Sequence, residues 1–221
     1  MIDREKILGI EQKAETFARL KHGEISHKRK YTGEPYTVHL EEVVKIVKGI
    51  PHTPEMIAAA WLHDTVEDTK TTIDEIKEEF GNKVAQLVEM LTDVSKSEQG
   101  NRVIRKNIDL EHTAKASSEA KTIKLADLIS NSRSIVDGDA EFARVFLEEK
   151  ARLLQVLKQG NQTLWKEAFR LMKDGMNKLQ MNEATQGSPI RIGFFPGSLD
   201  HRMLVILKQQ KMHRWRTIMF L

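Results

Sequence analysis

The chain has 221 residues, of which 40% are hydrophobic and 30% charged, so it can form one sizeable core but not two full domains. It contains no cysteine, which excludes a disulfide framework and thiol catalysis. Its first residues are charged and lack the apolar stretch of a signal peptide, and no apolar run approaches the roughly 18 residues that span a bilayer. We therefore expect a cytoplasmic protein without a membrane partner.

The formal net charge of +3 is unevenly distributed. From Pro189 onward there are six basic residues and one acidic residue, which gives this segment a charge of +5. The rest of the chain holds 29 basic and 31 acidic residues, which gives −2. The basic character thus belongs to the C-terminal segment, and the main domain is not expected to bind nucleic acid.

Apolar residues recur at helical spacing through most of the chain, and no convincing strand pattern precedes residue 188. Thr53 and Thr72 are expected N-caps. The predicted helices span residues 4–22, 37–48, 54–64, 73–80, a further segment from Asn82, and then 102–116, 121–131, 140–158 and 161–180.

These helices predict an all-α fold. We expect a helical domain over residues 1–181, a polar linker at 182–188, and a basic and apolar extension of uncertain structure at 189–221. The extension is expected to pack on the domain or on a second subunit, which would make a homo-oligomer. A disordered terminus is the alternative.

The predicted helix 54–64 is apolar at first and ends in a cluster of ionisable residues. His63 and Asp64 are followed by Glu67 and Asp68, and each pair four residues apart shares one side of a continuing helix. Buried charge is costly unless it is paired or binds a metal, so this cluster favours a metal site. The alternative is a polar helix end with His63 as a core histidine.

Two further helices carry polar side chains that suit the same site. His39 lies near the start of helix 37–48, where it can reach a neighbouring helix. Asp127 and Asn131 lie four residues apart on one face of the apolar helix 121–131, so both need a buried partner.

A basic loop at residues 27–36 precedes His39. It contains Arg29 and Lys30 together with two aromatic residues, and its glycine and proline indicate a non-helical segment. A run of charges is most often a solvated turn. The position just before His39 favours a role in substrate binding instead.

Together these segments resemble the HD phosphohydrolase superfamily, and specifically the hydrolase domain of the RelA/SpoT alarmone enzymes. The resemblance rests on residues 30–39, 63–69 and 123–127, which occur in the family's order, and it covers roughly residues 4–180. It implies a compact multi-helix HD-domain bundle. Because the synthetase and regulatory domains of long members are missing, it also implies a small alarmone hydrolase of the stringent response.

The resemblance assigns His39, His63, Asp64 and Asp127 as ligands of manganese. Two imidazole nitrogens and two carboxylate oxygens suit a borderline divalent cation, so another divalent metal is also compatible.

The resemblance also assigns the catalytic and substrate-binding residues. Glu67 and Asp68 match the family's acidic pair, which would orient or deprotonate the attacking water and protonate the leaving oxygen. Asn131 matches a residue near the substrate ribose, and Arg29 and Lys30 match a basic pair that contacts the base or a phosphate.

Three departures from the family pattern stand in this sequence. Leu40 replaces the proline that usually follows the first histidine, and Leu128 replaces an arginine after the metal-binding aspartate. The loop between the basic pair and Gly33 is one residue longer than in some long members, which weakens the match of Arg29 and Lys30.

The expected activity is metal-dependent hydrolysis of the 3′-diphosphate of guanosine tetra- or pentaphosphate (ppGpp, pppGpp), with release of pyrophosphate. One alternative keeps the site and changes the nucleotide to an adenosine alarmone, the 2′-phosphate of NADPH or a nucleoside monophosphate. Another is a nucleotide-sensing or interaction module without turnover. The retained acidic pair argues against that module, because binding alone does not need it.

Overall fold

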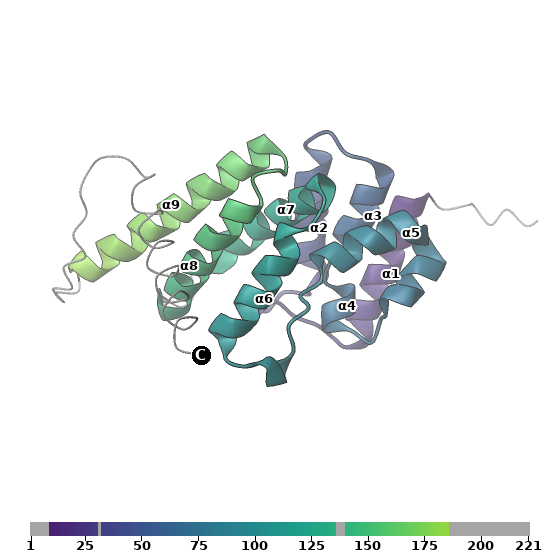
Figure 1. Ribbon diagram of the computed structural model, residues 1–221, viewed down its shortest axis with the longest axis horizontal. Coiled ribbons are helices and arrows are strands. Elements are labelled where there is room, and N and C mark those ends of the chain that lie inside the picture. The colour runs from purple at the N-terminus through teal and green to yellow at the C-terminus, as the bar shows by residue number, and fades with distance from the viewer. Residues whose placement is uncertain (1–8, 31, 136–139, 186–221) are drawn as a thin grey trace, which may run out of the picture. The chain divides into compact units, whose positions relative to one another are not determined.

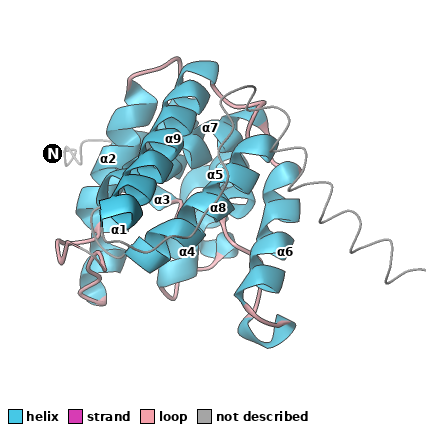
Figure 2. Cartoon of the chain, turned by 90° about the vertical axis from the view of Figure 1, so that its left-hand side faces the viewer, coloured by secondary structure: helices cyan, strands magenta, loops and turns pink. Residues whose placement is uncertain are grey.

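The computed structural model describes residues 9–30, 32–135 and 140–185, and the regular structure of these residues is helical (Figures 1 and 2). One isolated antiparallel bridge, between Lys28 and Pro35, closes the basic loop. The all-α prediction is confirmed. Among the described residues, no helix is both long enough and apolar enough to cross a membrane.

The helices follow the predicted order, and α2 has the predicted bounds. In chain order they are α1 (Ile10–Glu24), α2 (Thr37–Lys48), α3 (Pro54–Leu62), α4 (Thr65–Asp68), α5 (Ile73–Leu91), a 3₁₀ turn η1 (Ser97–Gln99), α6 (Arg102–Ala114), α7 (Ser118–Ile135), α8 (Ala140–Val156) and α9 (Gln162–Thr185).

Helix α3 lies at the centre of this domain. The hydroxyl of Thr53 accepts a hydrogen bond from the backbone N–H of Met56 at 3.3 Å, and Pro54 occupies the first turn, as predicted. Every residue from Met56 to Leu62 is buried. Because this helix is apolar on all sides, it packs against α1, α2, α5 and α7 at once.

Helix α7 is the second buried helix, and the turn before α9 crosses it closely. A Cβ atom on Gly160 would lie 2.9 Å from Leu125 Cδ1 and 3.1 Å from the backbone of Lys121, so only glycine fits here without a shift. The backbone N–H of Asn161 donates to the hydroxyl of Thr122 at 2.9 Å. This contact fixes the start of α9 against α7.

One helix end near the site differs from the sequence prediction, and one predicted helix break is present. Helix α3 ends at Leu62, and the chain makes a turn through His63 and Asp64 before α4. The break expected at Gly81 is confirmed, because Gly81 is non-helical, with φ 82° and ψ 170°, and separates two helical stretches that together make up α5. A glycine is needed there because side chains rarely adopt that backbone conformation.

The chain forms two units, Met1–Glu183 and Ala184–Leu221. Helix α9 continues to Thr185, past the boundary expected at residue 181. The predicted extension 189–221 lies outside the described residues, so its packing and any role in assembly remain a proposal.

The first prediction concerns this extension. The buried hydrophobic residues of the described core run from Ala14 to Met172. A chain that ends at Thr185 should therefore keep the helical circular dichroism spectrum and cooperative melting of the full chain, and should differ mainly in mass by light scattering. Loss of cooperative melting would mean that the extension forms part of the core.

Candidate metal and active site

The structure brings the four predicted ligands together from three parts of the chain. His39 projects from α2, His63 and Asp64 lie between α3 and α4, and Asp127 lies on α7. The Nε2 atom of His39 is 3.3 Å from Asp127 Oδ1 and 3.7 Å from Asp64 Oδ2. The Nε2 atom of His63 is 2.9 Å from Asp64 Oδ2 and 3.9 Å from Asp127 Oδ1. All four side chains thus border one small space.

Hydrogen bonds on the far side of each imidazole fix its orientation. His63 Nδ1 lies 2.9 Å from the carbonyl oxygen of Ala60, which can only accept, so Nδ1 carries the proton. His39 Nδ1 lies 2.9 Å from the hydroxyl of Ser130, which itself donates to Glu42 Oε2 at 2.5 Å. When each ring is neutral, its unprotonated nitrogen is therefore Nε2, which faces the carboxylates.

This arrangement fits a divalent cation. Both Nε2 atoms are buried and have no hydrogen-bond partner, although His39 and His63 are at most 1% exposed. Buried polar atoms are normally satisfied, and neutral imidazole nitrogens beside carboxylates are common metal ligands. Imidazoles that donate their other N–H are also the usual pattern around a bound metal.

The pKa values show that the cluster stabilises positive charge. Burial alone would lower the pKa of His39, but the carboxylates of Asp127 and Asp64 outweigh it and raise that pKa to about 9. The pKa of His63 is also raised, despite burial, by the charge of Asp64. Burial opposes ionisation of Asp64, yet the two imidazoles hold its pKa well below the usual range. A proton on the imidazoles can thus take the place of a cation.

Asp127 has two further partners on its own helix. Lys124 Nζ lies 3.6 Å from Asp127 Oδ2, and Asn131 Nδ2 donates to Asp127 Oδ1 at 2.6 Å. Burial works against the charge of Lys124, but Asp127 and neighbouring acids raise its pKa above the usual value. The sequence analysis placed Asn131 beside Asp127 but missed Lys124. Its spacing of three residues before Asp127 on a buried helix was the available signal.

Tyr36 is a second site residue that the sequence analysis missed. Its hydroxyl donates to Asp64 Oδ2 at 2.5 Å. Burial and the nearby charge of Asp64 raise the pKa of Tyr36, so the hydroxyl keeps its proton. Tyr36 stands three residues before His39 at the start of α2, a spacing that places both on one face.

The two predicted catalytic acids point to different neighbours. Glu67 accepts a hydrogen bond from the backbone N–H of Asp93 at 2.5 Å, whereas Asp68 Oδ2 lies 3.7 Å from His27 Nδ1. Partial desolvation and the charge of Asp64 raise the pKa of each acid to about 7. Such a value suits a general acid or base near neutral pH.

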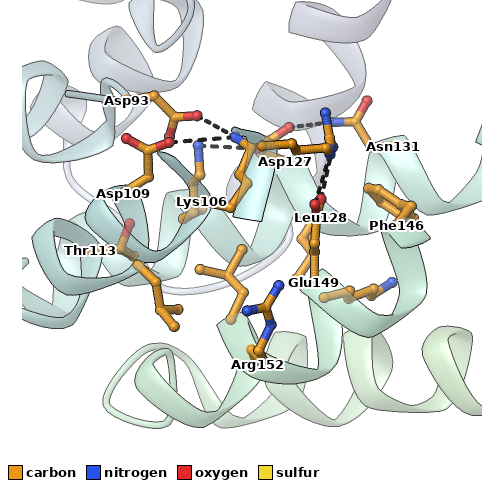
Figure 3. Close-up of a pocket in the computed structure, with 15 residues that line it drawn as sticks. Asp93, Lys106, Asp109, Thr113, Asp127, Leu128, Asn131, Phe146, Glu149 and Arg152 are labelled. Atoms are coloured by element: carbon orange, nitrogen blue, oxygen red, sulfur yellow. Dashed lines mark hydrogen bonds and ion pairs between the residues drawn. The ribbon is translucent and has the colours of Figure 1, made fainter. Parts of the chain in front are cut away.

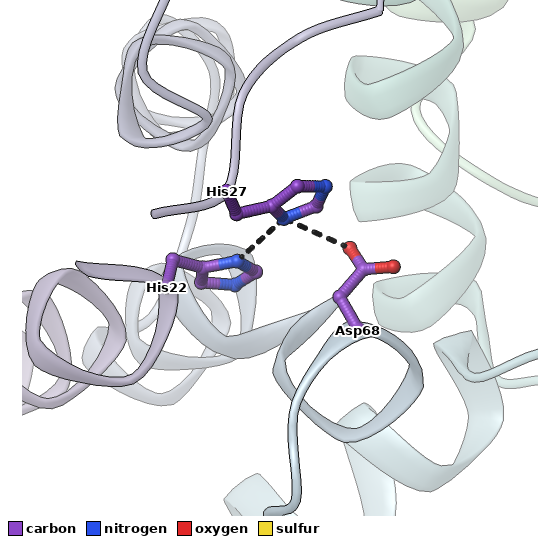
Figure 4. A group of neighbouring side chains, drawn as sticks. All are labelled: His22, His27 and Asp68. Carbon is purple, nitrogen blue, oxygen red and sulfur yellow. Dashed lines mark hydrogen bonds and ion pairs between the residues drawn. The ribbon is translucent and has the colours of Figure 1, made fainter. Parts of the chain in front are cut away.

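His22, His27 and Asp68 form a second group of side chains that could hold a metal (Figure 4). His22 Nδ1 and His27 Nδ1 lie 3.1 Å apart, and burial lowers the pKa of both rings, that of His22 to about 4. The Nε2 atom of His22 is buried without a partner. If a metal bound Nδ1 of His22, the ring proton would have to lie on Nε2. There it would have no acceptor, which costs about 1–3 kcal/mol. A hydrogen-bonded pair of neutral imidazoles is therefore favoured here.

Of the predicted basic pair, Arg29 is linked to the candidate ligand His39 through other side chains. Arg29 is buried and its Nη1 atom lies 3.3 Å from Glu42 Oε2, the carboxylate that also accepts from Ser130. Lys30 is exposed. Arg29 is thus connected to His39 through Glu42 and Ser130, and its predicted contact with substrate remains a proposal.

A cavity of about 310 Å³ begins at Asp127 and Asn131 and extends among residues of α6, α7 and α8 (Figure 3). Ion pairs join residues of its wall, such as Arg102 with Glu149 at 2.8 Å and Lys106 with Asp93 at 2.6 Å. The sequence analysis missed this cavity because its walls combine helices that are distant in the chain. Its charged residues are Asp93, Arg102, Lys106, Asp109, Lys124, Asp127, Glu149, Lys150 and Arg152.

A family model described as an HD domain matches residues 14–159, which include all four ligand candidates. The chain belongs to the HD-domain family. The expected family is therefore confirmed, and divalent-metal binding by this HD domain agrees with the His and Asp cluster.

Several known proteins are similar to this HD-domain chain. The guanosine-3′,5′-bis(diphosphate) 3′-pyrophosphohydrolase of Aquifex aeolicus is 40% identical over 143 residues, which are 64% of this chain and 19% of that protein. The Danio rerio protein of the same activity is 39% identical over 121 residues, or 54% of this chain and 65% of that protein. The match thus spans less than two thirds of either relative.

A solved structure shares the fold. It is described as a metazoan ortholog of SpoT that hydrolyzes ppGpp and plays a role in starvation responses. The TM-score is 0.66 at 26% sequence identity, and the alignment covers 76% of this chain and 96% of that chain. The HD-domain bundle expected from the sequence is therefore confirmed.

The second prediction tests the hydrogen bond behind His39. Replacing Ser130 with alanine removes the acceptor that holds the proton on Nδ1, so metal affinity should fall by about 10-fold to 100-fold, the usual effect of such outer partners. Ser118→Ala on the exposed start of the same helix is the matched control. Equal metal content of Ser130→Ala and wild type after dialysis against limiting metal would contradict this role.

The third prediction concerns pH. Because the pKa of His39 is raised to about 9, a cation must displace a proton at neutral pH. Metal affinity should therefore rise with pH between 6 and 8, by about tenfold per pH unit for each proton displaced. Equilibrium dialysis with metal analysis measures this slope, and a flat profile would exclude protonated imidazoles in the metal-free protein.

Proposed function

We propose that this chain hydrolyses the 3′-diphosphate of ppGpp and pppGpp and releases pyrophosphate. The observation that carries the proposal is the cluster of His39, His63 and Asp64, with Asp127 3.3 Å from His39, in a chain similar to 3′-pyrophosphohydrolases. An acidic pair follows Asp64 in the sequence. The four ligand roles, and those of Glu67 and Asp68, are part of the proposal.

The cavity beside Asp127 and Asn131 supports a nucleotide substrate. Its volume of about 310 Å³ lies at the lower end of the range for small-molecule sites. Five cationic side chains line it, which suits a ligand with several phosphates. Because Asp127, one of the four candidate ligands, lines it, a nucleotide held there would place a phosphate beside the cluster.

We further propose that manganese is the resident cation. Two imidazoles with two carboxylates offer mixed nitrogen and oxygen ligands, which manganese accepts. When bound, such a cation would promote ionisation of water and offset charge on the attacked phosphate.

The protein side chains then handle the protons of the reaction. Water attacks the 3′-linked phosphorus, the bond from phosphorus to the ribose 3′-oxygen breaks, and that oxygen takes up a proton. With pKa values near 7, Glu67 and Asp68 can each accept a proton from water or donate one to the leaving oxygen. Tyr36 holds Asp64 in place through its hydroxyl.

The experiment that tests this function uses manganese-loaded protein and a panel of nucleotides. We expect pyrophosphate release from ppGpp and pppGpp to exceed phosphate release from NADPH, an adenosine alarmone or nucleoside monophosphates. Faster hydrolysis of another nucleotide of the panel would show that the proposed substrate is wrong and that the proposed metal site is still catalytic. Tight binding of ppGpp without turnover would favour a nucleotide-sensing module.

The fourth prediction separates chemistry from metal binding. Glu67→Gln and Asp68→Asn should each keep the metal and lower kcat by about 10²-fold or more, the usual range for acid–base groups. Glu78→Gln on the exposed face of α5 is the control, because Glu78 lies away from the cluster. Wild-type rates in both test variants would show that neither carboxylate transfers a proton.

A further inference from the structure

Lys150 is a buried amine that the proposed reaction does not use. It lies on α8 with 1% of its surface exposed, and its Nζ atom donates to the hydroxyl of Ser132 on α7. Within the described part of the chain, no carboxylate lies at ion-pair distance from this Nζ atom. Lys150 also lines the cavity that begins at Asp127 and Asn131.

The other lysines of this cavity differ from Lys150 in their partners. Lys106 forms an ion pair with Asp93 at 2.6 Å, and Lys124 lies 3.6 Å from Asp127. Burial of an ammonium group is costly unless an anion compensates it. Lys150 therefore lacks the compensation that its neighbours have.

We propose that Lys150, whose Nζ atom is held by the hydroxyl of Ser132, forms an anion subsite in the wall of this cavity and binds a phosphate group of the nucleotide. The proposal rests on the proposed function only in that a nucleotide supplies the phosphate. The hydroxyl of Ser132 donates to the carbonyl oxygen of Leu128, so towards Lys150 it acts as an acceptor that orients Nζ. The ammonium group has further N–H donors for phosphate oxygens and would gain the anion that it lacks.

Protonation gives this subsite a distinctive property. Burial lowers the pKa of Lys150 to about 7, and Glu167 of α9 and Asp127 of α7 oppose this shift only in part. At pH 8 the free amine is mostly neutral, and a bound phosphate would favour its ammonium form, so binding should take up a proton. The other charged groups around the cavity are Arg102, Lys106 and Asp109 of α6, Asp93 before it, Lys124 of α7, and Glu149 and Arg152 of α8.

Lys121 provides a matched comparison with a structural role. It is also buried, at 3% exposed, but its Nζ atom donates to the carbonyl oxygen of Ala114 at 2.9 Å and to Gln159 Oε1 at 2.7 Å. Lys121 does not line the cavity beside Asp127. A nucleotide should therefore not affect it.

The test is calorimetric titration of the metal-loaded protein with GDP, which has no 3′-diphosphate, in buffers of different ionisation enthalpy at pH 8. For wild type and Lys121→Met we expect uptake of up to about one proton per GDP bound. Lys150→Met should bind GDP about 10-fold to 100-fold more weakly, without proton uptake. Lys150→Arg should bind nearly as well as wild type but also without uptake, because arginine is always protonated.

Two ligand controls identify the group that is bound. Inorganic pyrophosphate should cause the same proton uptake as GDP, and guanosine should cause none. Lys150-dependent uptake with GDP but not with pyrophosphate would mean that the subsite needs the whole nucleotide, and it would overturn a simple phosphate site.

The inference fails if Lys150→Met and wild type bind GDP equally, or if wild type takes up no proton. This outcome is distinct from failure of the proposed function. Hydrolysis of ppGpp with GDP binding that is insensitive to Lys150 would overturn the subsite alone. Lys150-dependent proton uptake without hydrolysis of ppGpp would keep the subsite and overturn the proposed reaction.

Discussion

Two buried imidazoles that face two carboxylates are the constraint on which the rest of this site depends. His39 and His63 are held from behind by Ser130 and by the carbonyl oxygen of Ala60, so their free nitrogens must point at Asp64 and Asp127. His63 is fully buried at the end of the apolar helix α3. In such surroundings the carboxylates need positive charge, which either protons on the imidazoles or a divalent cation can supply.

Neighbouring residues also stabilise the negative charge of the two carboxylates. Tyr36 donates to Asp64, and Lys124 lies beside Asp127. Glu67 and Asp68 keep raised pKa values because Asp64 is close and solvent is partly excluded. The low polarity of the site thus has two effects. It favours a cation at the four ligands, and it raises the pKa values of Glu67 and Asp68 into the range useful for proton transfer.

The sequence predicted the fold, and the meeting of four candidate ligands, better than it predicted the residues around them; the ligand roles themselves stay a prediction. Helix periodicity gave the bounds of α2, and the apolar run before His63 gave the central position of α3. It placed the end of α3 two residues too late because backbone turns depend on tertiary contacts. Ser130 pairs with His39 across 91 residues of chain, and such pairs leave no local pattern. Lys150 was missed for the same reason, since its partner Ser132 lies on another helix.

The central claim is that His39, His63, Asp64 and Asp127 hold one divalent cation. Anomalous diffraction from crystals grown with manganese tests it most directly, because the manganese signal locates the ion without reference to activity. The account predicts a peak bonded to Nε2 of both histidines and to an oxygen of each carboxylate. A peak at His22, His27 and Asp68 with none at the four ligands, or no peak in manganese-saturated crystals, would contradict it.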